Sequence, residues 1–311
     1  RFNGVTPEPT AKPIPAGVFQ LGTTAALAPT AEPAGDSVLY YAADNGHISS
    51  LDPADQTSTL VSATNLPHLI DAVWSGDTRQ VIEVSAGKTG DVYKYYNFDT
   101  KELVSLGSNI MSAAFSPDGS RIVLAQDNGD ETDIKIAQPD GSGEAIILKT
   151  KFSRVSLVWP SENTISLLAD TTDGQTLYQI DAQGNITDLM ETQSPANISW
   201  SPLGNQVLYS VASAGNPELE IYSLADKKSR ELNFQANADQ CAWSHDGLTV
   251  ICAGEQNHAG TIVSINTADG SVKSLFSQLI LTPSKVLLTK NENFLVLENP
   301  NDSTLYAFKL R

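Results

Sequence analysis

The sequence predicts an all-β fold built from seven similar units, and three observations support this. First, the stretch "AAFSPDGSRIVLA" (residues 113–125) is typical of a hairpin, because Pro117, Asp118 and Gly119 favour a tight turn between two apolar strands. Second, degraded copies of it recur at a period slightly above 40 residues. Third, no segment has a helical periodicity. Four short strands per unit at this period are typical of a β-propeller, so we predict a seven-bladed β-propeller of four-stranded antiparallel blades.

The units are marked by the residue before each turn, which we call the anchor. Successive anchors are separated by 43, 41, 44, 41, 43 and 45 residues. They are Ala31, Trp74, Phe115, Trp159, Trp200, Trp243 and Leu288. After each turn we expect a second apolar strand, such as "RIVLA" (121–125), and then a third and a fourth strand.

The two ends of the chain predict how the ring closes. The seventh unit stops after its third strand, which would leave a sheet edge unpaired. The stretch "GVFQLGT" (17–23) matches "ELVSLGS" (102–108), the expected fourth strand of the second unit. We therefore predict that Val18–Leu21 forms the missing outer strand and closes the ring. The propeller domain then spans residues 17–311, after a Pro-rich linker at residues 1–16.

The linker and the composition bear on localisation. A linker of this kind fits a processed precursor with a signal peptide or membrane anchor upstream, and it equally fits an arbitrary boundary of the sequence. The low Lys content and abundant Thr, Ser, Ala and Asn favour a periplasmic, extracellular or cell-surface protein.

Charge excludes one class of partner. The chain has 311 residues, with 19 Lys and Arg against 36 Asp and Glu, and its net charge is −17. Such a surface repels phosphate backbones, so nucleic acid is not an expected partner. No apolar run reaches the roughly 18 residues that a membrane-spanning helix needs.

The repeat resembles a known family. The "SPDG" turn followed by strands such as "RIVLA" or "QVLYS" is similar to the WD-repeat-like blades of the TolB family of periplasmic β-propellers, over residues 17–311. The resemblance implies the fold but not a function, because this blade type serves scaffolds, binding modules and peptidase side domains. These residues encode no counterpart of the α/β domain of TolB proteins, so the envelope role of TolB is not carried over.

A ring of polar residues is the first candidate site. Three residues before each anchor from the second unit onward, an otherwise apolar inner strand has a polar residue. These residues are Asp71, Ser112, Ser156, Asn197, Gln240 and Lys285. Two interpretations remain open: side chains satisfied by water in the central channel, or groups that converge on a small-molecule ligand.

An acidic segment is a weak candidate for calcium. In "DNGDETD" (127–133), expected as a loop of the third unit, Asp127, Asp130 and Asp133 supply carboxylates. The spacing departs from the EF-hand pattern and lacks the distal Glu, so a solvated acidic loop is the simpler interpretation. The loop histidines His47, His68 and His258 lie at no metal-ligand spacing. We predict no cofactor.

No catalytic motif is present, neither a Gly-x-Ser-x-Gly elbow nor a phosphate-binding glycine loop, so no catalytic residues are predicted. The leading functional prediction is a non-enzymatic protein-interaction or scaffold module, exported or at the cell envelope, with an unidentified protein partner. The runner-up is a small-molecule or glycan-binding protein with its site at the channel mouth. A lyase or hydrolase with dispersed carboxylates comes third.

The two cysteines give the first testable prediction. In the sixth hairpin the register that pairs Trp243 with Val250 also places Cys241 opposite Cys252. Opposed residues of antiparallel strands have Cα atoms about 4.5 to 5.5 Å apart, within disulfide range. We expect a bond that stabilises by about 2 to 3 kcal/mol before strain. Intact-mass measurement after denaturing alkylation without reductant should show no alkylated thiol, whereas two alkylated thiols would mean that both cysteines are free.

Overall fold

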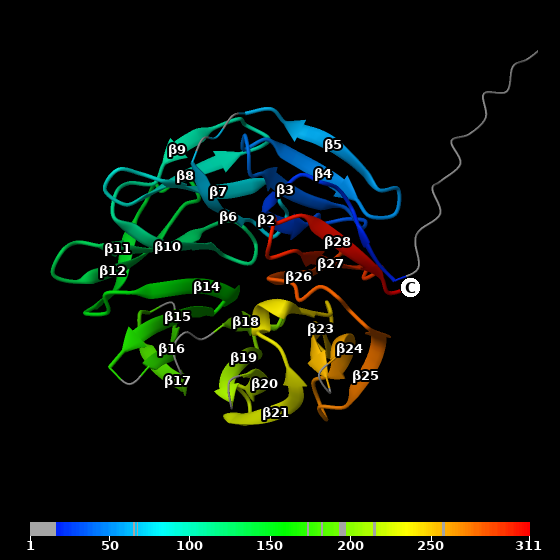
Figure 1. Ribbon diagram of the computed structural model, residues 1–311. Coiled ribbons are helices and arrows are strands. Elements are labelled where there is room, and N and C mark those ends of the chain that lie inside the picture. Colours follow the sequence, from blue (N-terminus) through cyan, green and yellow to red (C-terminus); the bar gives the residue numbers. More distant parts are fainter. Residues whose placement is uncertain are drawn as a thin grey trace, which may run out of the picture.

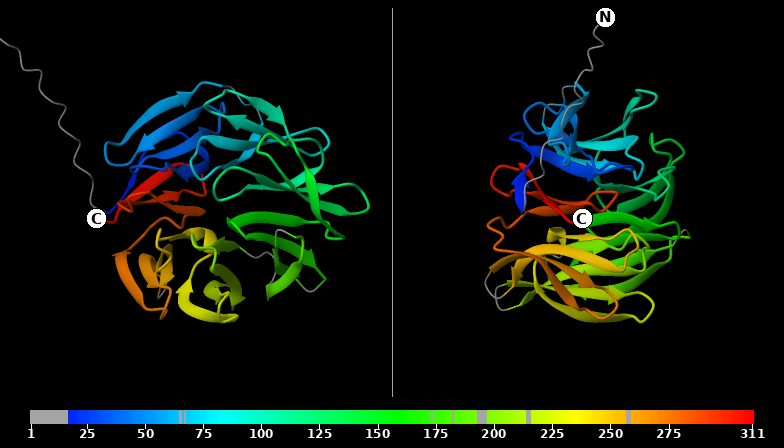
Figure 2. Two further views of the ribbon diagram at one scale, coloured as in Figure 1. Left: turned by 180° about the vertical axis from the view of Figure 1, so that it is seen from behind. Right: turned by 90° about the vertical axis from the view of Figure 1, so that its right-hand side faces the viewer.

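The computed structural model describes residues 17–64, 66, 68–172, 174–181, 183–192, 197–213, 216–256 and 259–311. Within these residues the regular structure is β-sheet, apart from one short 3₁₀ helix, η1 (Ala238–Gln240). The sheets are arranged around a central axis, and the first strands (blue) lie beside the last (red) (Figure 1). Figure 2 shows the same arrangement from behind and from the side. No helix of the described residues is long and apolar enough to cross a membrane.

Five of the sheets are four-stranded and antiparallel. The first contains β2 (Ala26–Ala31), β3 (Val38–Ala42), β4 (Ile48–Asp52) and β5 (Thr57–Ser62). The second contains β6 (Leu69–Trp74), β7 (Gln80–Ala86), β8 (Asp91–Asn97) and β9 (Leu103–Ser105). The third contains β10 (Ile110–Phe115), β11 (Ile122–Asp127), β12 (Thr132–Ala137) and β13 (Ala145–Thr150). The fourth contains β14 (Val155–Ser161), β15 (Thr164–Thr171), β16 (Gly174–Ile180) and β17 (Ile186–Thr192).

The remaining strands form an eight-stranded sheet and a sheet that joins both ends of the chain. The eight-stranded sheet begins with β18 (Ile198–Trp200), β19 (Gln206–Ser213), β20 (Asn216–Ser223) and β21 (Lys228–Gln235). It continues with β22 (Cys241–Trp243), β23 (Thr249–Gln256), β24 (Ala259–Asn266) and β25 (Val272–Ser277). A single residue pair, Gln235 with Glu255, links its two halves. The last sheet has the order β1 (Val18–Gln20), β28 (Leu305–Lys309), β27 (Phe294–Glu298) and β26 (Lys285–Leu288).

Each sheet buries both of its faces, as β3 illustrates. All five residues of this strand are buried. Val38 and Tyr40 pack in one cluster with Phe294 of β27, whereas Leu39 and Tyr41 pack in another with Ala72 and Val81 of the second sheet. Successive strand residues point to opposite faces, so the uninterrupted apolar stretches are those of strands packed between two neighbouring sheets.

A hydroxyl group fixes the turn that follows the inner strand. Ser116 accepts a hydrogen bond from the backbone N–H of Arg121 at 3.0 Å and donates one to the Asp118 carboxylate at 2.6 Å. Gly119 has φ +69°, a backbone conformation that glycine adopts without strain. The same bond, from the N–H five residues further on, recurs at the equivalent hydroxyls. They belong to Ser75, Ser201, Ser244 and Thr289.

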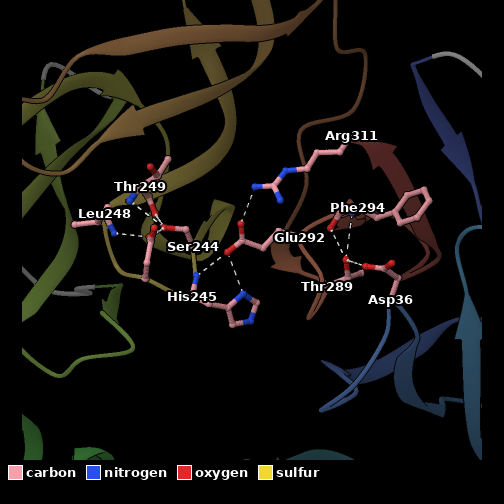
Figure 3. Close-up of polar contacts among 10 residues, drawn as sticks. Asp36, Ser244, His245, Leu248, Thr249, Thr289, Glu292, Phe294 and Arg311 are labelled. Atoms are coloured by element: carbon pink, nitrogen blue, oxygen red, sulfur yellow. Dashed lines mark hydrogen bonds and ion pairs between the residues drawn. The ribbon is translucent and has the colours of Figure 1, made fainter.

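We call the end of the sheets with these turns the turn face, and the opposite end, where loops join second to third strands, the loop face. On the turn face the residue two positions after Thr289 is Asn291, whereas Asp77, Asp118 and Asp246 occupy the equivalent positions after Ser75, Ser116 and Ser244. The Thr289 hydroxyl instead donates to Asp36 of the first sheet's turn, at 2.6 Å (Figure 3). Asn293 donates to the same carboxylate at 2.7 Å.

Glu292 connects the last sheet to its other neighbour. Its carboxylate accepts a hydrogen bond from the backbone N–H of His245 at 2.8 Å and lies 3.2 Å from a guanidinium nitrogen of Arg311 (Figure 3). The last sheet is therefore tied by side chains to the sheets on both sides.

The structure corrects three local expectations. β14 runs through Trp159 and Pro160 to Ser161, which pairs with Thr164, so the turn lies at Glu162 and Asn163 rather than at 160–163. Gln240 lies in η1 and Asn197 lies before β18, so neither is within an inner strand. Asp133 belongs to β12 rather than to a loop. In the first and third cases, cross-strand pairing extends the strand into residues whose polarity suggests a loop.

Removal of the Asp36 carboxylate should weaken the fold. Burial opposes ionisation of Asp36, but hydrogen bonds from Thr289 and Asn293 outweigh it and hold the pKa below its ordinary value. We expect Asp36→Ala to lower the free energy of unfolding by about 1 to 3 kcal/mol in urea titrations at neutral pH. Because the folded-state pKa is lowered, the difference should shrink as the pH falls through the carboxylate range.

The matched control for this prediction is Asp55→Ala, since the Asp55 side chain is exposed. Equal stability of the two variants would show that the link between the first and last sheets contributes nothing.

A buried carboxyl group lies between the first two sheets. Glu83 is 4% exposed, its Oε1 accepts a hydrogen bond from Tyr41 at 3.1 Å, and its Oε2 has no partner. Burial raises the pKa of Glu83, although the Tyr41 hydrogen bond and Lys94 oppose this effect. The ionised form is therefore disfavoured in the folded state.

Glu83→Gln should stabilise the protein at neutral pH. A raised folded-state pKa means that stability falls as the pH rises above the ordinary value of about 4.3. The variant should gain about 1 kcal/mol at pH 7 and nothing at pH 4, measured as urea midpoints across this pH range. Glu162→Gln, at an exposed site, is the control. A gain from Glu83→Gln that is the same at pH 4 and pH 7 would contradict the assignment.

Candidate functional site

The loop face has a polar hollow where three sheets meet. Its volume is about 520 Å³, and we call it the loop-face hollow. It lies between the second, third and fourth sheets, where β10 and β14 begin. It is lined by residues 89–92, 107–111, 127 and 153–155.

Short backbone contacts build its walls. The loop between β7 and β8 closes through a hydrogen bond from the Gly87 N–H to the Gly90 carbonyl at 3.1 Å, and Gly90 has φ +150°. Asn109 has φ +59°, a conformation that Asn tolerates better than most residues, and its carbonyl accepts from the Asp127 N–H at 2.9 Å. The hollow is thus held by main-chain bonds, which leaves most lining side chains available.

Apolar groups from β8, β10 and β14 lie beneath the polar rim. Ile110 is buried, and Met111 and Val155 are half-buried. The Met111 carbonyl accepts a hydrogen bond from the Tyr93 hydroxyl at 2.9 Å. Burial, with the nearby carboxylates of Asp91 and Asp71, raises the pKa of Tyr93 to about 12, so the phenol remains a proton donor at neutral pH. This bond fixes the start of the inner strand β10.

The rim combines one cation, two carboxylates and neutral polar groups. Arg154 has a side chain that is 81% exposed, and its Nη1 lies 3.7 Å from Asp170 Oδ2. Asp91 and Asp127 supply carboxylates, and an oxygen of Asp127 accepts the Gly129 N–H at 2.7 Å. Hydroxyl and amide groups complete the lining. They belong to Thr89, Ser108, Asn109 and Ser153. Such a set can bind a ligand rich in hydroxyl groups through donors and acceptors alike.

Two residues of the predicted polar ring adjoin this hollow. Ser112 and Ser156 each follow a lining residue by one position along β10 and β14. The Ser112 hydroxyl accepts a hydrogen bond from the Leu157 N–H at 2.9 Å, which joins the two inner strands, whereas Ser156 is exposed. Asp71 lies in β6 and is exposed.

The other three ring residues have different surroundings. Gln240 is buried, donates to the Pro283 carbonyl at 2.8 Å and accepts from the Asn237 N–H at 2.8 Å, so the protein itself satisfies it. The Asn197 carbonyl accepts from the Ser210 N–H. Lys285 is exposed, and it opposes the increase that burial causes in the pKa of Asp239 and Glu298.

The acidic segment forms ion pairs with a lysine of β13 and with the lysine just after this strand. Asp133 lies 3.4 Å from Lys149, and Glu131 lies 3.3 Å from Lys151. Asp127 lines the hollow, and Asp130 is exposed. Of the three loop histidines, His258 lies outside the described residues. Within the described part of the chain no three His, Cys, Asp or Glu side chains come together to hold a metal ion.

The cysteines are placed as the hairpin register predicts. Cys241 of β22 lies opposite Cys252 of β23, and the structure joins them in a disulfide with a Cα separation of 4.0 Å. Whether both are oxidised in solution is decided by the mass measurement proposed above.

Arg154 was not among the residues proposed from the sequence, although the repeat has a signal for it. Arg154 precedes its anchor by five residues, and every other unit has an apolar residue at that position. Those residues are Ala26, Leu69, Ile110, Pro195, Ala238 and Pro283.

Comparisons with known proteins support the architecture. No protein-family model matches the sequence, and no curated protein matches it. Among solved structures, an oligogalacturonate lyase in complex with manganese matches with a TM-score of 0.70 and 12% identity, over 94% of this chain and 93% of that one. An oligogalacturonate lyase from Vibrio parahaemolyticus matches with a TM-score of 0.68, at 12% identity and over the same shares of both chains.

TolB from Acinetobacter baumannii also matches, with a TM-score of 0.54 and 14% identity, over 81% of this chain and 63% of that one. Another match is the β-propeller domain of Swd1 from Myceliophteria thermophila. At these identities the likeness shows the fold alone, which is an all-β propeller fold. No sequence match supports membership of the TolB family.

These matches correct the leading functional prediction. Two of the structures that match over nearly the whole length of both chains are those of oligogalacturonate lyase, which is an enzyme, so the matches do not support the prediction of a non-enzymatic scaffold. The manganese of that enzyme has no counterpart in a set of ligands here, because the described residues lack a group of three metal-binding side chains. We therefore derive no chemical step through a metal.

Proposed function

We propose that this chain is a seven-bladed β-propeller that binds a glycan in the loop-face hollow. Seven blades are supported by the 28 strands among the described residues, which divide into sets of four when the eight-stranded sheet is split at its single linking pair. The pairing of β1 with β28 supports closure of the ring by the N-terminal strand. The Asp36 contacts with Thr289 and Asn293 add a second connection between the first and last blades.

The composition of the loop-face hollow carries the functional proposal. Its volume of about 520 Å³ lies in the range typical of small-ligand sites. Hydroxyl, amide and carboxylate groups surround a partly apolar floor. A sugar presents hydroxyl groups that both donate and accept, together with an apolar C–H surface. The polar rim and apolar floor of the hollow therefore suit a sugar better than they suit a flat protein surface.

The two cysteines bear on the compartment in which the protein functions. We propose that the protein functions outside the cytosol, because the buried pair Cys241 and Cys252 is placed to form a disulfide, and such bonds persist in oxidising compartments.

A sugar lyase is the second candidate function. It is favoured by the match to oligogalacturonate lyase structures over nearly the whole of both chains. Glycan binding is common to both candidates, so binding is the property to test first.

The test is isothermal titration with the trisaccharides of galacturonate and of galactose. We expect the wild-type protein to bind at least one of them, and Ser153→Trp to weaken binding about tenfold or more, because a large side chain fills the hollow. Ser274→Trp on the outer strand β25 is the matched control and should bind as the wild type does. Absence of binding to both sugars, or full binding by Ser153→Trp, would reject the proposed site.

A further inference from the structure

We infer that Arg154 recognises a carboxylate of the bound glycan directly, so that the site selects sugar acids without a metal ion. This inference rests on the proposed function and deepens it by naming the chemical class of the ligand. It is carried by the position of Arg154 in the repeat, by the hydrogen-bonding capacity that the described residues leave unused on its guanidinium, and by the charges around it.

Packing does not account for an arginine at this position. The equivalent residue of every other unit is apolar, and Ala26, Ile110 and Ala238 are buried. Arg154 instead extends from the start of β14 into solvent at the rim of the hollow, with its side chain 81% exposed. A residue that departs from its repeat in both chemistry and exposure contributes little to packing, so its guanidinium is available for a ligand.

Among the described residues, the Arg154 guanidinium has few partners. Among the described residues its one ionic contact is with Asp170 at 3.7 Å, which is longer than a hydrogen bond. Asp170 itself accepts a hydrogen bond from Gln175 at 2.7 Å. By contrast, Arg230 donates to the carbonyl of Thr267 at 3.0 Å. Arg154 therefore retains the planar pair of N–H donors that binds a carboxylate in bidentate fashion.

The surrounding charges disfavour a dianionic phosphate group more strongly than a carboxylate. Asp91 and Asp127 line the hollow together with Arg154, and Asp170 lies 3.7 Å from the Arg154 guanidinium, so these four side chains carry a net charge of −2. A phosphate monoester carries close to two negative charges at neutral pH and is repelled more strongly than a carboxylate. The same three groups can accept hydrogen bonds from the hydroxyls of a sugar ring. A uronic acid unit presents a planar monoanion and several hydroxyls together.

The absence of a metal-binding set among the described residues distinguishes this site from that of a manganese-containing neighbour. Among the described residues that line the hollow, Arg154 is the cation, so its guanidinium is the group that can neutralise a bound carboxylate.

Titration calorimetry with matched acidic and neutral sugars tests the inference. The wild-type protein should bind the galacturonate trisaccharide about tenfold more tightly than the galactose trisaccharide, and EDTA should not change either affinity. Arg154→Ala should lose this preference for the acidic sugar, and Arg154→Lys should keep part of it. Asp170→Asn should strengthen acidic binding about two- to fivefold, because it removes the carboxylate that competes for the guanidinium.

Arg79→Ala is the control, because Arg79 forms an exposed ion pair with Asp99 on the turn face. An unchanged preference in Arg154→Ala, or loss of acidic binding in EDTA, would overturn the inference. Equal binding of both sugars by the wild type would also overturn it while leaving the glycan-binding proposal intact. Absence of binding to either sugar would reject both proposals.

Discussion

Burial of both faces of every sheet is the constraint on which the rest of the structure depends. A strand such as β3 packs Val38 and Tyr40 against the last sheet and Leu39 and Tyr41 against the second. Each sheet needs a neighbour on both sides to bury its two apolar faces. The first and last sheets must therefore pack against each other. Asp36 joins them across the turn face, and β1 pairs with β28 in the last sheet. These contacts hold the two ends of the propeller next to each other.

The side chains of the turn face and of the loop face differ in how many hydrogen bonds they make within the protein. On the turn face, hydroxyls such as those of Ser116 and Thr289 form hydrogen bonds with backbone and carboxylate partners. On the loop face, main-chain bonds such as that from Asp127 to Asn109 hold the walls of the hollow. Because main-chain bonds hold these walls, the side chains of the loop face are less needed for stability. The exposed Arg154 can therefore replace an apolar residue of the repeat. Function in repeat folds commonly resides in such departures.

The Arg154 guanidinium is a local positive group on a chain whose net charge is strongly negative. A net charge of −17 disfavours most anionic ligands at long range. At hydrogen-bond distance, the Arg154 guanidinium, which contacts Asp170 at 3.7 Å, can still bind a carboxylate in bidentate fashion. The lysines beside the acidic segment behave differently, since Lys149 and Lys151 pair with Asp133 and Glu131.

The sequence by itself determined the repeat, the hairpins and the pairing of Cys241 with Cys252, because period, turn chemistry and strand register are local properties. Phe115 ends β10 and Ile122 begins β11, as the Pro-Asp-Gly turn predicts. Only the tertiary structure decided which polar residues meet. Gln240 is satisfied by Pro283, 43 residues away, and Arg154 reaches the hollow because three sheets converge there. Such contacts depend on the distances between sheets, and no spacing within a single unit encodes those distances.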